Sequence, residues 1–124
     1  MKQENLIKNR SKEFAILVIR TVQTVLERTG FVEKSLLIQL LRSGTSIGAN
    51  VREAEHAESK IDFIHKMKIA LKEANETAYW LELLHETNYL DETQFQALNS
   101  MCVELNRVLI SIVKTTKDNI SNNS

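Results

Sequence analysis

The sequence has no proline, only three glycines and a single cysteine among its 124 residues. Sheet proteins use Gly and Pro in their many turns, so a chain this poor in both is expected to form few, long helices. One cysteine cannot form an intrachain disulfide, and no apolar run reaches the roughly 18 residues of a membrane-spanning helix. No segment resembles a signal peptide. These absences predict an all-α, soluble, cytoplasmic protein of one domain.

The chain also lacks an excess of charge of either sign. Sixteen Lys and Arg residues balance sixteen Asp and Glu residues, so the formal net charge is zero. A neutral chain has no overall basic field that would attract nucleic acid or an anionic membrane. We therefore expect no membrane partner, and any contact with nucleic acid must come from a local patch.

Four stretches of the sequence carry apolar residues at the i, i+3, i+4 spacing of a helix that faces a core. They predict helices over residues 11–30, 34–58, 60–86 and 91–117. Short connections between four such helices predict an antiparallel up-down-up-down four-helix bundle at residues 11–117. Residues 1–10 form an N-terminal extension that either frays or continues the first helix. Residues 118–124 are a polar tail that we expect to be disordered.

Three local patterns mark helix ends in this sequence. Gly30 is expected to end the first helix as a left-handed C-terminal cap. Ser59, with Asp62 three residues later, has the pattern of a capping box at the start of the third helix. Asp91 and Gln94 have the same pattern at the start of the fourth helix. These patterns set the expected boundaries of the bundle helices.

The second predicted helix is unusually rich in small residues. Gly44 and Gly48 lie one turn apart, and each glycine costs a helix interior roughly 1 kcal/mol relative to alanine. We expect both to be there because they let a neighbouring helix approach closely. Ser46, Asn50 and Glu53 fall on the opposite, small and polar side of the same helix.

The third predicted helix has apolar residues on the side away from its core stripe. Ile69, Tyr79, Trp80 and Leu83 lie there. One interpretation is that the two aromatic side chains lap over the edge of the bundle, as amphipathic aromatics often do. The other, which we favour, is a subunit interface, because two apolar faces on one helix imply two burial partners.

Two short rows of basic residues could contact phosphates. The rows are Lys66, Lys68 and Lys72 on the third helix, and Arg107, Lys114 and Lys117 on the fourth. The alternative is an ordinary solvated face, because Glu73, Glu76 and Glu104 are interleaved with them.

A metal centre is the sharpest catalytic alternative, because Glu53–His56 and Glu82–His85 both have the Glu-x-x-His spacing of di-iron bundles. If the chain folds back near Ser59, His85 lies about 26 residues beyond the turn, roughly 39 Å along the helix axis from His56. One site cannot span that distance, which leaves only a metal shared between subunits.

Other catalytic groupings are also missing from the sequence. Cys102 lies on the core stripe of the fourth helix, and no positioned base accompanies it. Gly44-x-x-x-Gly48 lacks the strand and the Lys of a nucleotide loop. We expect no enzyme activity, no cofactor, no metal and no small-molecule substrate; a metal-binding bundle enzyme is the remote alternative.

The second helix also carries a pattern that resembles a known family. The stretch TSIGANVREA at 45–54 resembles the S-I-P-x-N-I-A-E-G signature of the bacterial 23S rRNA intervening-sequence proteins. Ser46, Ile47, Asn50 and Glu53 match directly, while Gly48 replaces the signature proline. QLLR at 39–42 resembles the family's approach to that signature, and KIDF at 60–63 resembles its entry to the third helix. The resemblance covers roughly residues 14–113.

The resemblance implies a four-helix bundle and a non-catalytic role. Some relatives are similar to the accessory variability protein of diversity-generating retroelements, a pentameric ring that binds a reverse transcriptase and nucleic acid. The resemblance therefore implies a homo-oligomer, expected to be a pentamer, that serves as a scaffold for RNA, DNA or a nucleic-acid enzyme, such as ribosomal RNA or a reverse transcriptase. The alternative is a protein-binding adaptor that never touches nucleic acid. Ser46, Asn50 and Glu53 are then expected to fix a helix neighbour or a subunit contact by hydrogen bonding.

Overall fold

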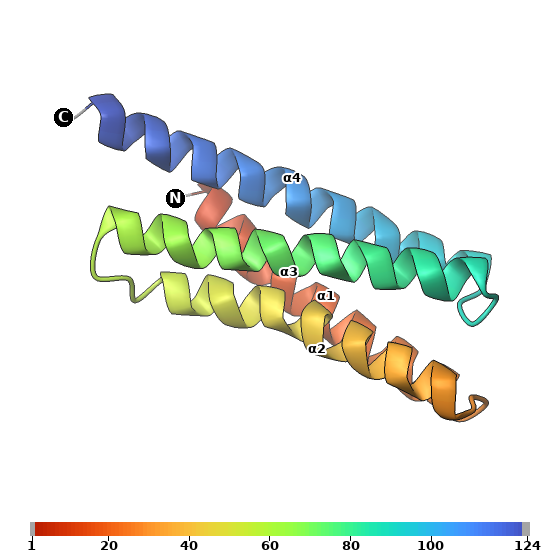
Figure 1. Cartoon of the computed structure of the whole chain (residues 1–124). Coiled ribbons are helices and arrows are strands. Elements are labelled where there is room, and N and C mark those ends of the chain that lie inside the picture. Colours follow the sequence, from red (N-terminus) through yellow and green to blue (C-terminus); the bar gives the residue numbers. More distant parts are fainter. Residues whose placement is uncertain (1, 123–124) are drawn as a thin grey trace.

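The protein is an all-α bundle of four antiparallel helices, shown in Figure 1. This computed structural model describes residues 2–122. The helices are α1 (Lys2–Leu26), α2 (Phe31–Ala54), α3 (Lys60–Glu86) and α4 (Glu92–Asn122). Contacts join α1 to α2, α2 to α3, α3 to α4 and α1 to α4, and no diagonal pair of helices is in contact within residues 2–122. The predicted four-helix bundle is confirmed.

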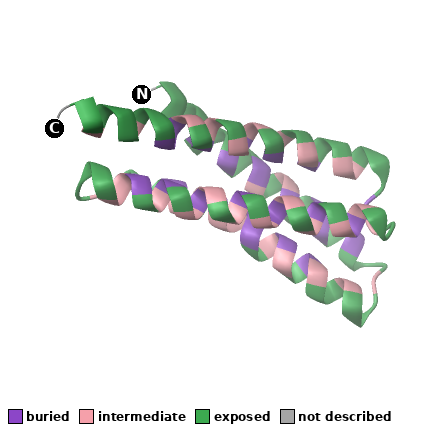
Figure 2. Cartoon of the chain, turned by 45° about the horizontal axis from the view of Figure 1, so that its top comes forward, coloured by how far each residue is buried: buried purple, intermediate pink, exposed green. Residues whose placement is uncertain are grey.

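The core consists of one apolar stripe from each helix. Each helix in Figure 2 shows buried and exposed residues alternating around its turns, as amphipathic helices in a bundle do. The largest fully buried side chains include Phe14, Leu37, Leu40, Ile47, Met67, Leu81, Leu84, Leu98, Leu105 and Leu109. Burying one such side chain contributes about 1.5–3 kcal/mol relative to leaving it exposed. No described helix has an apolar stretch long enough to cross a membrane.

Both terminal helices extend beyond the bundle limits of 11–117, and α1 takes up the N-terminal extension, which is one of the two expected alternatives. Helix α1 begins at Lys2, because Ile7 is fully buried and extends the core stripe toward the N-terminus. Helix α4 continues to Asn122, so the disordered tail expected at 118–124 is wrong for 118–122. Ile120 packs against the core there and gives the added turn an apolar anchor. Residues 123–124 of that expected tail lie outside the described residues.

The helix-end patterns are borne out in two of three places. Ser59 Oγ accepts a hydrogen bond from Asp62 N at 3.0 Å. At the start of α4, Gln94 N donates to Asp91 Oδ1 at 2.7 Å and Asp91 N donates to Gln94 Oε1 at 3.0 Å. Gly30 is not a left-handed cap: its φ of −89° is extended, and it precedes α2 as its N-cap. Helix α2 also ends at Ala54, four residues before the predicted Glu58, and the chain turns there toward the Ser59 cap.

Two loops meet at one end of the bundle. Figure 1 shows the α1–α2 and α3–α4 loops at this end, while both termini and the α2–α3 loop lie at the other. Arg28 in the first loop donates to the backbone oxygen of Tyr89 at 3.2 Å, and the Tyr89 hydroxyl donates to Glu33 at the start of α2. The Tyr89 hydrogen bond holds the pKa of the Glu33 carboxyl below its ordinary value. These contacts fix the two loops to each other.

Helix α2 lies close to α1 at its two glycines, as the sequence predicted. A Cβ at Gly44 would lie 3.0 Å from Val18 Cγ2 and 3.2 Å from Val18 Cγ1. A Cβ at Gly48 would lie 3.4 Å from Ser11 Oγ, which is ordinary contact. The first glycine is therefore required by a tight helix crossing, whereas the second leaves room for a methyl group.

This difference predicts opposite effects of two alanine substitutions. Gly48→Ala should stabilise the protein by about 0.5–1 kcal/mol, because alanine is the better helix former and its methyl group fits. Gly44→Ala should lose that gain to overpacking against Val18, which costs about 1–3 kcal/mol in well-packed cores. Urea denaturation of both variants measures the difference. Equal stability of the two variants would contradict the assignment of Gly44 as the tight contact.

Candidate functional site

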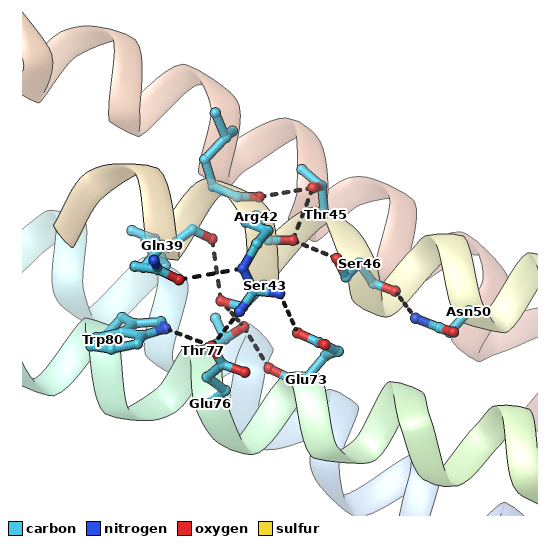
Figure 3. Close-up of polar contacts among 12 residues, drawn as sticks. Gln39, Arg42, Ser43, Thr45, Ser46, Asn50, Glu73, Glu76, Thr77 and Trp80 are labelled. Atoms are coloured by element: carbon cyan, nitrogen blue, oxygen red, sulfur yellow. Dashed lines mark hydrogen bonds and ion pairs between the residues drawn. The ribbon is translucent and has the colours of Figure 1, made fainter. Parts of the chain in front are cut away.

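The most extensive polar network lies between α2 and α3 and is centred on Arg42 (Figure 3). The Arg42 guanidinium contacts Glu73 at 3.5 Å and also pairs with Glu76, both on α3. Its Nε donates to Gln39 Oε1 at 3.3 Å. Trp80 Nε1 donates to Glu76 Oε1 at 3.3 Å, so Arg42 and Trp80 both bind the Glu76 carboxylate. Arg42 is about half exposed, and we therefore treat this network as a groove contact rather than a buried ion pair.

A hydroxyl pair lies beneath this network, inside the core. Ser43 on α2 and Thr77 on α3 are both fully buried, and a hydrogen bond of 2.9 Å joins their side chains. Thr77 Oγ1 also lies 2.7 Å from the backbone oxygen of Glu73. Buried hydroxyls are costly unless they are hydrogen-bonded, so this pairing favours one register of α2 against α3.

The three signature residues form no hydrogen bond to another helix. Ser46 Oγ donates to Arg42 O at 2.6 Å, and Asn50 Nδ2 donates to Ser46 O at 2.8 Å, so both bonds stay within α2. Glu53 is exposed, and its side chain has no hydrogen bond or ion pair in the described part of the chain. The predicted bond to a neighbouring helix of the same subunit is thus not present, which leaves the predicted subunit contact.

The structure separates the four residues predicted to form a subunit interface. Trp80 packs against the edge of the core and lies on the α2 flank of α3, next to Glu76. Ile69 lies seven residues before Glu76 and Leu83 lies seven residues after it, so both are on the same flank of α3. Both are half-buried. Tyr79 is 54% exposed and stacks obliquely on Trp80, with ring centroids 5.4 Å apart. Trp80 therefore packs over the edge of the bundle, as one of the two interpretations expects, whereas the Tyr79 side chain remains mostly exposed.

Part of the predicted basic set gathers along the edge between α3 and α4. Lys68 on α3 lies near Lys117 on α4, and this neighbouring ammonium group lowers the pKa of Lys68. Lys114 and Lys117 line a surface depression of about 280 Å³ together with Leu71, Ile110 and Asp118. We call Lys68, Lys114 and Lys117 the cationic edge. Of the other three predicted residues, Lys72 and Arg107 are exposed and Lys66 is half-buried.

The acidic residues predicted to be interleaved with these cations are paired elsewhere. Glu73 and Glu76 bind Arg42 in the α2–α3 groove, and Glu104 binds Arg10 at 3.4 Å in the α1–α4 groove. Within residues 2–122, none of the six predicted basic residues forms an ion pair with a carboxylate. The cationic edge is therefore locally positive on a chain of zero net charge.

The groups considered for catalysis lie apart in the structure. His85 is hydrogen-bonded to Glu92 at 2.7 Å and stacks on Phe95, at the loop end of the bundle. His56 is exposed, just after α2 at the opposite end. Among the described residues, no three His, Cys, Asp or Glu side chains come close enough to hold a metal ion. Burial raises the pKa of the Cys102 thiol to about 11, so this thiol is protonated at neutral pH.

The sequence interpretation missed a group of exposed apolar residues near the α1–α2 loop. Phe31 is 85% exposed and Ile38 is 60% exposed, more than any residue of the predicted interface. The two lie seven residues apart, on one side of α2. That spacing is visible in the sequence, but the core stripe of the same helix is the stronger signal and obscures it.

Comparisons with known proteins agree with this architecture. The family model described as 23S rRNA-intervening sequence protein matches residues 3–111. A solved structure of a protein with unknown function from the S23 ribosomal protein family of Bacteroides thetaiotaomicron VPI-5482 is 50% identical in sequence, with a TM-score of 0.84. That match covers 90% of this chain and 98% of the other. Among curated proteins, none matches this sequence. Because the family model spans most of the chain, the protein belongs to the 23S rRNA-intervening sequence protein family.

Proposed function

We propose that this protein is a non-catalytic, self-associating scaffold that contacts the phosphates of RNA through the cationic edge between α3 and α4. The observation that carries the proposal is the grouping of Lys68, Lys114 and Lys117 along one edge of the bundle. The ammonium groups of Lys68 and Lys117 repel each other there, and none of the three lysines forms an ion pair with a carboxylate within residues 2–122. An RNA phosphate placed there would relieve the repulsion between the two ammonium groups. Phosphate contacts of this kind supply most of the affinity of non-specific nucleic-acid binding.

The names of the relatives support RNA over other polyanions. The matched family is named for an intervening sequence of 23S rRNA, and the solved relative is assigned to a ribosomal protein family. We therefore propose structured RNA, such as ribosomal RNA, as the ligand. DNA and a nucleic-acid enzyme such as a reverse transcriptase are the other partners that the family resemblance implies. The proposal retains the expected cytoplasmic location.

Self-association completes the proposed scaffold. Tyr79 on α3 and Phe31 on α2 are large apolar side chains that are mostly exposed, so two different helices offer apolar surface to another subunit. The similarity to pentameric proteins stated above makes a pentamer the expected size. The buried hydroxyls of Ser43 and Thr77 are hydrogen-bonded to each other, and the buried thiol of Cys102 is protonated, so we propose no reaction for this protein.

Binding to RNA should depend on the cationic edge. The variant Lys68→Gln/Lys117→Gln should lose on the order of 10-fold in affinity for a structured RNA, and the slope of log affinity against log salt should fall by roughly one to two. Filter binding between low and high salt measures both quantities. The control Lys2→Gln/Lys60→Gln removes the same charge at the first residues of α1 and α3, outside the cationic edge, and should retain wild-type binding.

Two results would contradict this proposal. Equal loss of binding in both double variants would mean that overall charge, not the cationic edge, holds the RNA. Absence of salt-sensitive binding by the wild-type protein at micromolar concentration would favour the adaptor that binds only protein.

The side of α2 that carries Ser46, Asn50 and Glu53, here called the signature face, gives a separate prediction about assembly. Asn50 is half-buried and bonded only within its own helix, so Asn50→Leu should leave the monomer folded but change the size of the oligomer. Circular dichroism with temperature and light scattering test the two parts of this statement. Asn50→Ser keeps a polar side chain and serves as the control. Unchanged oligomer size in Asn50→Leu would show that the signature face makes no subunit contact.

A further inference from the structure

The surface depression beside the cationic edge is not explained by phosphate contact alone. It lies between the first half of α3 and the last turns of α4, toward the end of the bundle that holds both chain termini (Figure 1). Its volume is about 280 Å³, and it is lined by Leu71, Ile110, Val113, Lys114, Lys117 and Asp118. Apolar, cationic and anionic side chains therefore share one depression.

The apolar part of the lining offers surface to a ligand. Val113 belongs to the core and Leu71 packs against it, so these two residues hold the depression in place. Ile110 is 54% exposed and has the most apolar surface left uncovered. Phosphate contact requires no apolar surface, whereas covering an exposed isoleucine side chain is favourable in water. A ligand that fits this depression has an apolar face as well as charge.

The lysines define the charge of that ligand. Lys114 and Lys117 line the depression, and Lys68, one turn before Leu71 on α3, lies near Lys117. None of the three forms an ion pair with a carboxylate within residues 2–122. Charge complementarity therefore favours an anionic ligand over a neutral apolar one.

Asp118 adds a third requirement. Its side chain is exposed and forms no hydrogen bond or ion pair in the described chain, although Lys114 lies one turn before it. A carboxylate accepts hydrogen bonds and repels a phosphate. A ligand with negative charge alone loses affinity at Asp118, whereas a ligand that also has N–H donors gains a hydrogen bond there.

A nucleotide with an unpaired base meets all three requirements. It has a phosphate, a flat ring face and N–H donors on the Watson–Crick edge. The depression has the volume of about nine water molecules at roughly 30 Å³ each, and a base has a similar number of non-hydrogen atoms. In a paired A-form helix the ring faces are stacked and the Watson–Crick edges are in use, so only an unpaired base can enter.

We infer that one unpaired base of the RNA lies in this depression. Its ring face packs on Leu71 and Ile110, and its Watson–Crick edge donates to Asp118. The phosphates next to it contact Lys114 and Lys117. This inference rests on the proposed RNA binding and specifies the RNA: the protein binds at a bulge or loop rather than along a paired stem.

Two RNA duplexes test the inference directly. One is paired throughout, and the other has the same stem interrupted by a short unpaired bulge. The wild-type protein should bind the bulged duplex on the order of 10-fold more tightly, because contacts with the face of an unpaired base add to the phosphate contacts. Filter binding at one fixed salt concentration measures this preference.

Ile110→Asn should reduce the preference for the bulged duplex on the order of 5-fold and leave binding of the paired duplex unchanged, because it removes apolar surface without changing charge. Val103→Asn is the matched control. Val103 is 53% exposed and lies seven residues before Ile110 on the same side of α4, but it does not line the depression. This control should keep the wild-type preference, and circular dichroism verifies that both variants remain helical.

Asp118→Ala should have opposite effects on the two duplexes. Removing a negative charge beside the phosphates should raise the affinity for the paired duplex. Losing the acceptor for the base should lower the affinity for the bulged duplex, so that the preference falls on the order of 5-fold. A purely electrostatic role of Asp118 would instead raise both affinities equally and leave the preference unchanged.

The outcomes separate this inference from the function on which it rests. Absence of binding to either duplex overturns both. Equal affinity of the wild type for the two duplexes overturns the unpaired base, leaves the phosphate contacts intact and favours an apolar protein segment as the occupant. A preference that Ile110→Asn or Asp118→Ala retains, or that Val103→Asn loses equally, also overturns the inference, because the base would then lie elsewhere.

Discussion

The close packing of α2 against both of its neighbours is the constraint on which the rest of the structure depends. At Gly44 the backbone of α2 approaches Val18 so closely that a methyl group would touch it at 3.0 Å. One residue earlier, Ser43 bonds to Thr77 on the other neighbour, α3. A close apolar contact on one side and a buried hydrogen bond on the other together fix the position and register of α2. Arg42 reaches the carboxylates of α3 because of that register.

The pairing of carboxylates in the grooves decides where free charge remains. Arg42 and Arg10 hold Glu73, Glu76 and Glu104 in two of the four grooves. The lysines of the cationic edge, and Glu82 and Glu86 before the α3–α4 loop, are then left without ion pairs in the described chain. Fields at a protein surface are screened within about 8 Å at physiological salt, so these local groups matter more to a partner than the net charge does. A neutral protein can in this way present separate cationic and anionic surfaces.

The fold could be predicted from the sequence because its signals are short-range. The capping residues Ser59 and Asp91 and the helical spacing of apolar residues act within a few turns of the chain. The end of α4 could not be predicted, because a polar composition is typical of a tail, whereas the single apolar residue Ile120 packs against the core. Gly30 was misassigned because the same residue type serves at both ends of helices.

The surfaces were harder to predict because they depend on how one helix is turned against the next. The sequence places Glu73 beside Lys72, but only the packing of α2 and α3 shows that Arg42 takes this carboxylate. It also places Tyr79 next to Trp80, although one is exposed and the other packs on the core.

The most direct measurement of the central claim is sedimentation velocity of the wild-type protein at physiological salt, with and without a labelled structured RNA. If separated surfaces of one neutral chain serve self-association and phosphate contact, the protein should sediment as an oligomer and carry the RNA with it. A species that sediments as a monomer and leaves the RNA at its own sedimentation rate would contradict the account.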